Sequence, residues 1–557
     1  MAAKITRNRK IQFKKYDQEQ VIQVPIDLST LIPSEHLVRI INRVVDDIDM
    51  SVLEKYYTGG GRNPYHPKML IKVWIYGYCE RVYTSRRLVK AMRENIHFIW
   101  LSGNQHPCFK TLSEFRGERM QGMIDVIFKQ VLLLLLESGY INLNDLYLDG
   151  SKWEANANQY KKVWRANTER YKQQVVLRIE SLLKEIKTLQ AEEDAMYGNK
   201  DLRELGKGES LNIVLTSEEV SRHLINLHEL VEKEGLKQDS TTHTKYKELS
   251  RIKKQLEKEH ENLEKYEQQE RILGDRNSYS QTDTDATMLR MKDSRLLPGY
   301  NTQAITSNQF ALCYTIASNA SDSPTMPHIL DKLVEHLKGI RPIEKINLCA
   351  DAGYGSEENY ADLEKRKMIP YVKYPLWYQE VSGELAKKKF RRENWVYNAE
   401  TDTYTCPNNR LLIFKAESIQ ISDNGYERIL RHYECTSCDN CPFAADCKKS
   451  ETSNRTVMHS PKGEAYKAQA KALLETEKEK EMRSTRSIEI ESTFGDIKYN
   501  MKHDRFVLRG KEKVYVEYGL LCIGHNLRKV YCLKSGIWAA YYAQRAARKA
   551  KKASKRA

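Results

Sequence analysis

Two aspartates in this chain each follow a short apolar run. Asp149 follows LYL and Asp351 follows NLCA, and a glycine comes within two residues of each acid. Such runs are typical of buried strands, and open α/β sheets bind ligands beyond the carboxyl ends of their strands. Two carboxylates at such strand ends could bind a divalent cation such as Mg²⁺, which takes oxygen ligands and keeps several waters. Taken singly, either acid could instead cap a turn or the following helix.

A third carboxylate is expected from a helix packed against the sheet. In IEIESTFGDIKYN, Glu491 and Lys498 are seven residues apart, which is two helical turns, so they would share a face with Phe494 between them. The carboxylate could bind metal and the lysine could hold a phosphate; the alternative is a solvated charge pair. Glu489 is the competing acid, but the residue seven positions after it is Asp496.

Five of the eleven cysteines lie close together in the sequence. Their compact spacing is typical of thiolates that surround one Zn²⁺ tetrahedrally, in a structural role. Five candidates for four places leave the spare one open between the first two, and a redox or incidental cluster is the alternative. The five are Cys406, Cys435, Cys438, Cys441 and Cys447.

The elements that must position these residues follow an α/β order. The acid at 149 would end the first strand; a hairpin over 299–318 turns at Ser307-Asn308-Gln309, and a helix over 326–339 leads to strands at 345–350 and 369–375. A long segment separates the first strand from the hairpin. The sequence therefore predicts an α/β domain that is interrupted after its first strand.

The interrupting segment has a heptad pattern. Apolar residues recur at steps of four and three, Glu259 occupies one core position, and a capping box from Thr216 to Glu219 opens a further helix. A helical hairpin or coiled coil is expected, serving as scaffold or dimer contact. The core positions are Val175, Ile179, Leu182, Ile186, Leu189, Leu249, Ile252, Leu256, Leu263 and Tyr266.

Residues 34–120 are predicted to form short helices separated by breakers. Arginines expected to be exposed, among them Arg86, Arg87 and Arg116, fit a helix-turn-helix DNA-binding unit; a generic helical bundle is the alternative.

The chain has 557 residues and a net charge of +16. This length suggests three or four structural units, and the charge favours a polyanionic partner. Basic residues are concentrated at both ends. The richest apolar run, over 126–140, is too short to span a membrane, and the N-terminus lacks the apolar core of a secretory signal, so no membrane partner is expected.

Three phrases of the sequence, in order, resemble the catalytic motifs of a known family. LYLDGSKWEAN, NLCADAGYG and IEIESTFGDIKYN are similar to the motifs of DDE transposases of bacterial insertion sequences, in the IS-four/IS-five-like superfamily and its subgroup with a long helical insertion after the first Asp. GRNPYHPKMLIKVWIYGY, HPCFKTLSEFR, PGYNTQAIT and RFVLRGKEKVYVEYGLLCIGHNLRK resemble other parts of the same family.

The resemblance implies a ribonuclease H-like fold, a mixed sheet flanked by helices, with Asp149, Asp351 and Glu491 as the triad for two Mg²⁺ ions, for which Mn²⁺ could substitute. It assigns Lys498 to a phosphate of the transposon end. The family signature Y-x2-R-x3-E-x6-K keeps its Glu and Lys here, but its Tyr and Arg positions fall on serines. The remaining DNA contacts are then expected from Arg486, one residue before the signature position, and from Arg86, Arg87, Arg505 and Arg509.

The expected function is that of a transposase that binds terminal inverted repeats and catalyses Mg-dependent cleavage and strand transfer. The alternatives are a ribonuclease H-like nuclease without strand transfer and a non-catalytic, zinc-containing DNA-binding protein. The expected partners are double-stranded DNA, at transposon ends and target, and a second copy in a homodimer; the expected location is the bacterial cytoplasm, at the nucleoid. The predicted layout is a basic arm (1–30), a helical DNA-binding domain (31–140), a catalytic core (141–164, 277–380 and 476–537), the helical insertion (165–276), a Cys-rich, zinc-binding insertion (381–475) and a basic tail (538–557).

Overall fold

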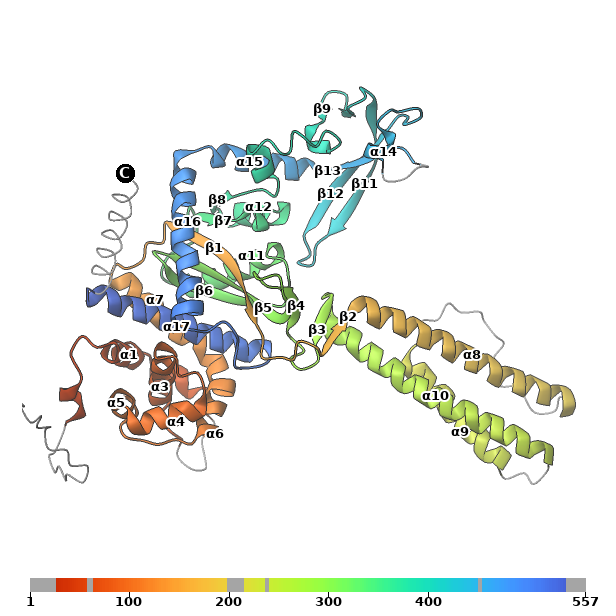
Figure 1. Ribbon diagram of the computed structural model, residues 1–557, viewed down its shortest axis with the longest axis horizontal. Helices are drawn as coiled ribbons and strands as arrows, with labels where there is room; N and C mark the ends of the chain where they lie inside the picture. The colour runs from red at the N-terminus through yellow and green to blue at the C-terminus, as the bar shows by residue number, and fades with distance from the viewer. Residues whose placement is uncertain (1–26, 58–63, 198–214, 236–239, 449–452, 537–557) are drawn as a thin grey trace, which may run out of the picture.

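The structure, a computed structural model, describes residues 27–57, 64–197, 215–235, 240–448 and 453–536 (Figure 1). The predicted basic tail and all but the last four residues of the predicted basic arm lie outside these ranges. None of the helices in the described ranges has the length and apolar character needed to cross a membrane.

A six-stranded mixed sheet forms the centre of the molecule. Its strands run in the order β4-β5-β1-β7-β8, with β6 also paired to β5. β1, β7 and β8 are parallel, whereas β5 is antiparallel to β1, β4 and β6. The predicted hairpin and the two later strands are therefore observed, and β4 was not predicted. The bounds are β1 Asp145–Glu154, β4 Thr287–Arg290, β5 Leu296–Ser307, β6 Phe310–Ala317, β7 Asn347–Ala350 and β8 Ile369–Val372.

The prediction that the first strand ends at Asp149 is wrong. β1 continues to Glu154 because its antiparallel pairing with β5 extends to Gly299. On its other edge, however, parallel pairing with β7 ends at Leu148 and Ala350. Asp149 thus lies just past the end of the parallel ladder with β7 but within the antiparallel ladder with β5. The pattern of residues along the sequence cannot distinguish these two situations.

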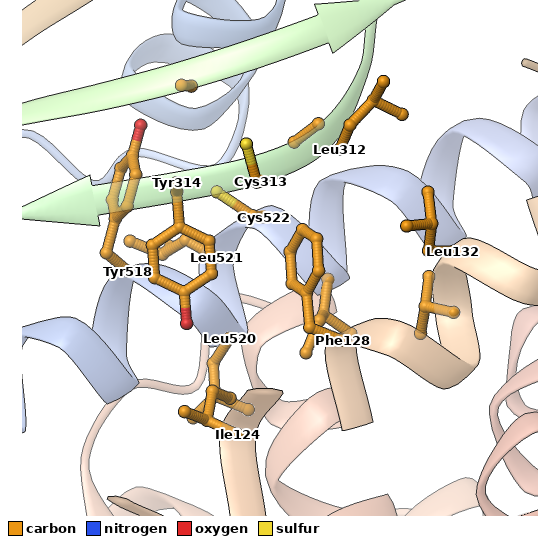
Figure 2. Close-up of a cluster of buried hydrophobic side chains, with 14 of the residues drawn as sticks. Ile124, Phe128, Leu132, Leu312, Cys313, Tyr314, Tyr518, Leu520, Leu521 and Cys522 are labelled. Atoms are coloured by element: carbon orange, nitrogen blue, oxygen red, sulfur yellow. The ribbon is translucent and has the colours of Figure 1, made fainter. Parts of the chain in front are cut away.

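Short helices precede the sheet, as predicted, and they share its hydrophobic core. The long helix α17 (Lys511–Lys534) joins the two parts, since it contacts α1, α3, α7 and β6. Figure 2 shows the centre of this contact, where Phe128 from α7, Tyr314 from β6 and Tyr518 from α17 pack together. The bounds are α1 Leu37–Asp46, α2 Met50–Glu54, α3 Pro67–Cys79, α4 Ser85–Glu94, α5 Ile96–Ser102, α6 Phe109–Glu114 and α7 Met120–Glu137.

The insertion projects from the sheet as an arm of three helices (Figure 1): α8 (Arg165–Tyr197), α9 (Ser217–Gly235) and α10 (Ser240–Leu273). Most of the predicted heptad positions are buried between them, and Leu189 and Tyr266 are partly buried. Glu259, at its core position, pairs with Arg178 at 3.2 Å. The capping box is confirmed, because the Thr216 N–H donates to the Glu219 carboxylate at 3.1 Å and the Glu219 N–H donates to Thr216 Oγ1 at 3.4 Å. At the root of the arm, β2 (Lys162–Trp164) pairs with β3 (Ser278–Ser280).

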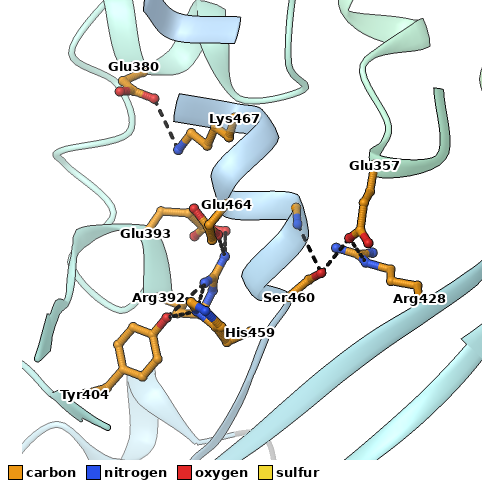
Figure 3. Close-up of polar contacts among 11 residues, drawn as sticks. Glu357, Glu380, Arg392, Glu393, Tyr404, Arg428, His459, Ser460, Glu464 and Lys467 are labelled. Carbon is orange, nitrogen blue, oxygen red and sulfur yellow. Dashed lines mark hydrogen bonds and ion pairs between the residues drawn. The ribbon is translucent and has the colours of Figure 1, made fainter. Parts of the chain in front are cut away.

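The cysteine-containing segment forms a separate antiparallel sheet in the order β13-β12-β11-β10-β9. Figure 3 shows how it is attached to helices beside the central sheet: Arg428 on β12 pairs with Glu357 at 2.9 Å, and Arg392 pairs with Glu464 at 2.6 Å. The bounds of these elements and of the neighbouring helices are β9 Val396–Asn398, β10 Thr403–Thr405, β11 Leu411–Ile421, β12 Glu427–Cys435, β13 Thr456–His459, α11 Met326–Leu337, α12 Glu357–Lys365, α13 Trp377–Val381, α14 Ala444–Cys447, α15 Pro461–Leu474 and α16 Glu477–Gly495.

Candidate active site

Asp149 and Asp351 lie side by side on neighbouring parallel strands. Each is the first residue beyond the last paired positions, Leu148 and Ala350. Since side chains alternate along a strand, both acids lie on the face that carries Tyr147 and Cys349. Those two residues pack against Met482 of α16, so this is the face that α16 crosses.

A partly buried arginine on α16 lies between the two acids. Arg486 Nη2 is 3.1 Å from Asp149 Oδ2 and 4.0 Å from Asp351 Oδ2. Burial raises the pKa of Asp149 to about 6; the Arg486 guanidinium and the Gly150 N–H oppose this shift, whereas Asp351 and Asp322 add to it. Arg486, which the sequence placed only as an approximate match to the family's arginine, is thus the direct partner of both acids.

A further acid, Asp322, was missed by the sequence analysis. Its Oδ1 accepts hydrogen bonds from Asn301 at 2.7 Å and Gln303 at 3.1 Å. A Cβ at Gly150 would lie 2.8 Å from the same oxygen and 2.5 Å from Gln303 Nε2, which explains the glycine after Asp149. Asp322 follows β6 in a loop with no motif around it, so no local signal could have identified it.

The two competing glutamates of α16 have different surroundings. Glu489 is buried and accepts a hydrogen bond from the Gln309 N–H at 2.6 Å, in the β5–β6 turn that lies beside the start of β1, where Asn308 donates to the Tyr140 carbonyl at 3.0 Å. Two residues rotate a helix by about 200°. Glu491 therefore points away from that turn, and it is exposed.

The expected triad is not assembled as a metal site. Across the described ranges, no three His, Cys, Asp or Glu side chains are arranged to hold a metal ion. The two adjacent aspartates nevertheless supply the hard oxygen donors that Mg²⁺ requires. The assignment of Glu491 as third ligand stays a prediction.

Lys498 lies in a π-helical turn, Asp496–Asn500, that continues α16. Its ammonium donates to Ser151 Oγ and to the Lys152 carbonyl, both at 2.8 Å, and lies 4.0 Å from the centre of the Trp153 ring. Ser151 is two residues beyond Asp149, on the same face of β1. Burial lowers the pKa of Lys498 to about 8, with Lys292 contributing in the same direction.

A hollow of about 490 Å³ opens beside Asp351. Tyr378 Oη lies 3.5 Å from Asp351 Oδ1, and Lys373 donates to Tyr378 Oη at 2.7 Å. The Lys373 ammonium also lies 5.0 Å from the centre of the Trp377 ring. The phrase VKYPLWY, a lysine with aromatic residues after a strand, was an available signal. The lining residues are Lys373, Trp377, Tyr378, Val381, Ser382, Arg483, Arg486 and Ser487.

The other candidate DNA-binding arginines lie on separate elements. Arg86 and Arg87 are exposed on α4. Arg505 pairs with Glu154 at 3.3 Å and Arg509 donates to the Asn156 carbonyl at 2.7 Å, so both hold the segment after β1.

The expectation that Arg116 is exposed is wrong. Arg116 is 3% exposed, because it donates to Tyr78 Oη at 3.0 Å and its guanidinium lies 4.2 Å from the centre of the Trp74 ring. An arginine on a short helix with aromatic neighbours can bury its planar group in this way.

The five candidate zinc ligands line one small cavity of about 20 Å³. The Arg455 N–H donates to Cys438 Sγ at 3.3 Å. Burial raises the pKa of the Cys435 thiol to about 12, and the neighbouring Cys438 and Cys406 raise it further. Such mutual repulsion is what a cation among the thiolates would relieve. The five cysteines therefore lie together around one cavity, but within the described ranges they are not arranged to hold a metal ion.

Two stretches of the chain match known protein families. Residues 26–118 match the transposase domain DUF772, and residues 405–531 match a transposase DDE domain. The second match contains Glu491 and Lys498, whereas Asp149 and Asp351 lie outside both. Searches of curated proteins and of solved structures found no match. The two family matches support a DDE transposase, an enzyme class that acts on DNA and generally uses divalent metals, and they agree with the resemblance read from the sequence.

Proposed function

We propose that this protein is a transposase that binds the terminal inverted repeats of its own insertion sequence and catalyses DNA cleavage and strand transfer. The observation that carries the proposal is the adjacent placement of Asp149 and Asp351 beneath a helix that falls within a DDE-domain match. Mixed sheets with acids at the ends of parallel strands are suited to metal-assisted phosphoryl transfer.

Asp149, Asp351 and Glu491 would hold the divalent ions. When bound, such ions supply activation of the attacking oxygen and stabilisation of the leaving oxygen. For Glu491 to join the aspartates, α16 must shift relative to the sheet from the arrangement described above, in which the Glu491 side chain is exposed. Glu489 is the poorer candidate, because its carboxylate already binds the Gln309 N–H.

The protein's own cations would position the DNA backbone. Lys498 donates to Ser151, two residues beyond Asp149 on β1, so a phosphate next to the scissile bond could reach it. Contacts with phosphates fix the register of the protein on the DNA without recognising its base sequence. Arg486, Arg86, Arg87, Arg505 and Arg509 are proposed as further contacts, and the net charge of +16 supports binding of a polyanion.

The remaining assignments concern assembly. We place a structural Zn²⁺ among Cys406, Cys435, Cys438, Cys441 and Cys447, and a homodimer contact on the helical arm, since two transposon ends must be joined in one complex. The protein would act in the bacterial cytoplasm, at the nucleoid.

The proposal is tested by Mg²⁺-dependent cleavage of DNA that carries the inverted repeats flanking the gene. Asp149→Asn, Asp351→Asn and Glu491→Gln are each expected to abolish cleavage and to leave end binding largely intact. Glu477→Gln is the matched control, because Glu477 is on the same helix with its side chain 88% exposed. Normal cleavage by Glu491→Gln would show that the triad is misassigned.

The alternatives are separated by a second assay. A nuclease without strand transfer would cut the ends but would not join pre-cut ends to target DNA. A non-catalytic DNA-binding protein would bind the ends and leave them intact in Mg²⁺ and Mn²⁺.

A further inference from the structure

Arg486 occupies the position of a cation between two acids. The same guanidinium nitrogen lies 3.1 Å from Asp149 Oδ2 and 4.0 Å from Asp351 Oδ2. The Arg486 side chain is 14% exposed, so the pair is screened from solvent and its attraction is stronger than that of a surface pair. Asp149 Oδ1 already accepts from the Gly150 N–H at 2.9 Å, which leaves Oδ2 as the oxygen turned to the arginine.

A divalent ion held by these two aspartates would need those same oxygens. It would then lie within a few ångströms of a guanidinium that cannot lose its proton in a protein. Two cations at that separation repel strongly in a partly buried site. Metal binding and the present position of Arg486 therefore exclude one another.

The structure offers Arg486 another place. The hollow of about 490 Å³ beside Asp351 is lined by Arg486 itself and by Arg483 and Lys373. These neighbours make the hollow strongly basic, so a second guanidinium would be stable there only with an anion. Arg486 Nε is buried without a hydrogen-bond partner in the described structure, which shows that its present position leaves one donor unsatisfied.

We propose that Arg486 controls metal binding at this site. In the DNA-free protein its guanidinium occupies the position of the divalent ion between Asp149 and Asp351, and the side chain rotates toward the basic hollow when a DNA phosphate binds there. Metal binding is then coupled to DNA binding, because the phosphate that draws Arg486 away frees the carboxylates. Coupling of this kind is reciprocal, so bound metal also raises the affinity for DNA. The inference rests on the proposed function and names the regulation of its site.

The test is a titration of the full chain with Mn²⁺, in which the electron paramagnetic resonance signal measures the free Mn²⁺. The titration is done without DNA and again with a duplex that carries the end of the element. Arg486→Gln is expected to bind Mn²⁺ at least about tenfold more tightly than the unaltered chain when DNA is absent. Adding the duplex is expected to raise the affinity of the unaltered chain more than that of the variant.

Arg483→Gln is the matched control. Arg483 is one turn earlier on α16, lines the same hollow, and pairs with Glu479 at 3.7 Å rather than with the aspartates. Arg483→Gln removes the same charge as Arg486→Gln. If the position of the arginine rather than the net charge decides Mn²⁺ affinity, Arg483→Gln should bind Mn²⁺ within about twofold of the unaltered chain when DNA is absent. Arg486→Met, which keeps length without charge, replaces Arg486→Gln if thermal unfolding shows that the glutamine variant is not folded.

Four outcomes decide the matter. Equal or weaker Mn²⁺ binding by Arg486→Gln and Arg486→Met overturns the inference, and so does an equal gain from Arg483→Gln. Mn²⁺ binding that persists unchanged in Asp149→Asn, or is absent from every variant with and without DNA, instead rejects the metal site of the proposed function.

Discussion

The backbone N–H of Gln309 donates to the carboxylate of Glu489 at 2.6 Å, and this bond joins the β5–β6 turn to the helix that carries Glu491. Thr493, one turn further along α16, donates its hydroxyl to the Gln309 carbonyl at 3.2 Å. His525 of α17 also contacts that carbonyl at 2.9 Å. The turn is thus held from two helices, and these bonds stabilise the observed rotation of α16 about its axis relative to the sheet.

Glu489→Ala is expected to destabilise the protein by about 1–3 kcal/mol, because it leaves the Gln309 N–H without its partner in a buried setting. Glu489→Gln, which keeps an acceptor oxygen, should lose less. Chemical denaturation of both variants and of the exposed control Glu477→Gln measures the difference. A loss for Glu477→Gln as large as for Glu489→Ala would contradict this role.

Asp149 should make stability depend on pH. Burial raises its pKa to about 6 from 3.8, so the folded state binds the proton more tightly than the unfolded state does. The contribution of Asp149 to stability is therefore fully present below pH 4. It is lost as the pH rises through about 6, by about 3 kcal/mol in total. Asp149→Asn is expected to stabilise the metal-free protein by up to that amount at pH 7.5 and to have little effect below pH 4.

The check is the difference in free energy of unfolding between the two proteins, in EDTA, at both pH values. A variant that is less stable than the unaltered chain at pH 7.5 would show that the bond to Arg486 outweighs the burial of the charge.

DNA binding through Lys498 should weaken in mild alkali. Burial lowers the pKa of this ammonium to about 8, so the charge that attracts a phosphate is lost as the pH rises through that value. Affinity for the transposon end is expected to fall between pH 7 and pH 9, with the salt slope of binding reduced by about one. Lys498→Met should bind more weakly at pH 7 and lack this pH dependence; an unchanged profile in that variant would assign the dependence to another group.

Removal of one cysteine should release zinc. Cys438→Ser is the sharpest variant, since Cys438 belongs to every proposed set of four and its sulfur accepts the Arg455 N–H. The purified protein is expected to contain one Zn²⁺, and the variant to contain none and to unfold at a lower temperature. Cys108→Ser is the control because Cys108 is exposed and outside the group. Equal zinc content in both variants would reject the site.

The two aspartates and the helical arm could be predicted because their residues carry local patterns. Asp149 and Asp351 follow apolar runs, and the heptads of the arm and its capping box at Thr216 are properties of short segments. Such patterns report burial on one face, which the fold then satisfies.

What could not be predicted depends on contacts between distant segments. β1 extends past Asp149 only because β5 pairs with it there, and Arg116 is buried only because Trp74 and Tyr78 receive it. Asp322 enters the site through a loop whose position is set by β5 and β6. The role of Arg486 likewise could not be predicted without the register of α16 on the sheet, because the family signature places its arginine one residue later.

The short ladder between β2 and β3 has a consequence for how this chain can vary. Because Lys162 pairs with Ser280 and Trp164 with Ser278, the polypeptide departs for the arm and comes back at one point. The length of the arm is thereby independent of the geometry of the sheet, since closing a longer loop at a fixed base adds little free energy. Whole turns of helix can be gained or lost beyond that ladder while the two aspartates keep their spacing. The reach of the arm can therefore change in evolution without a change in the site.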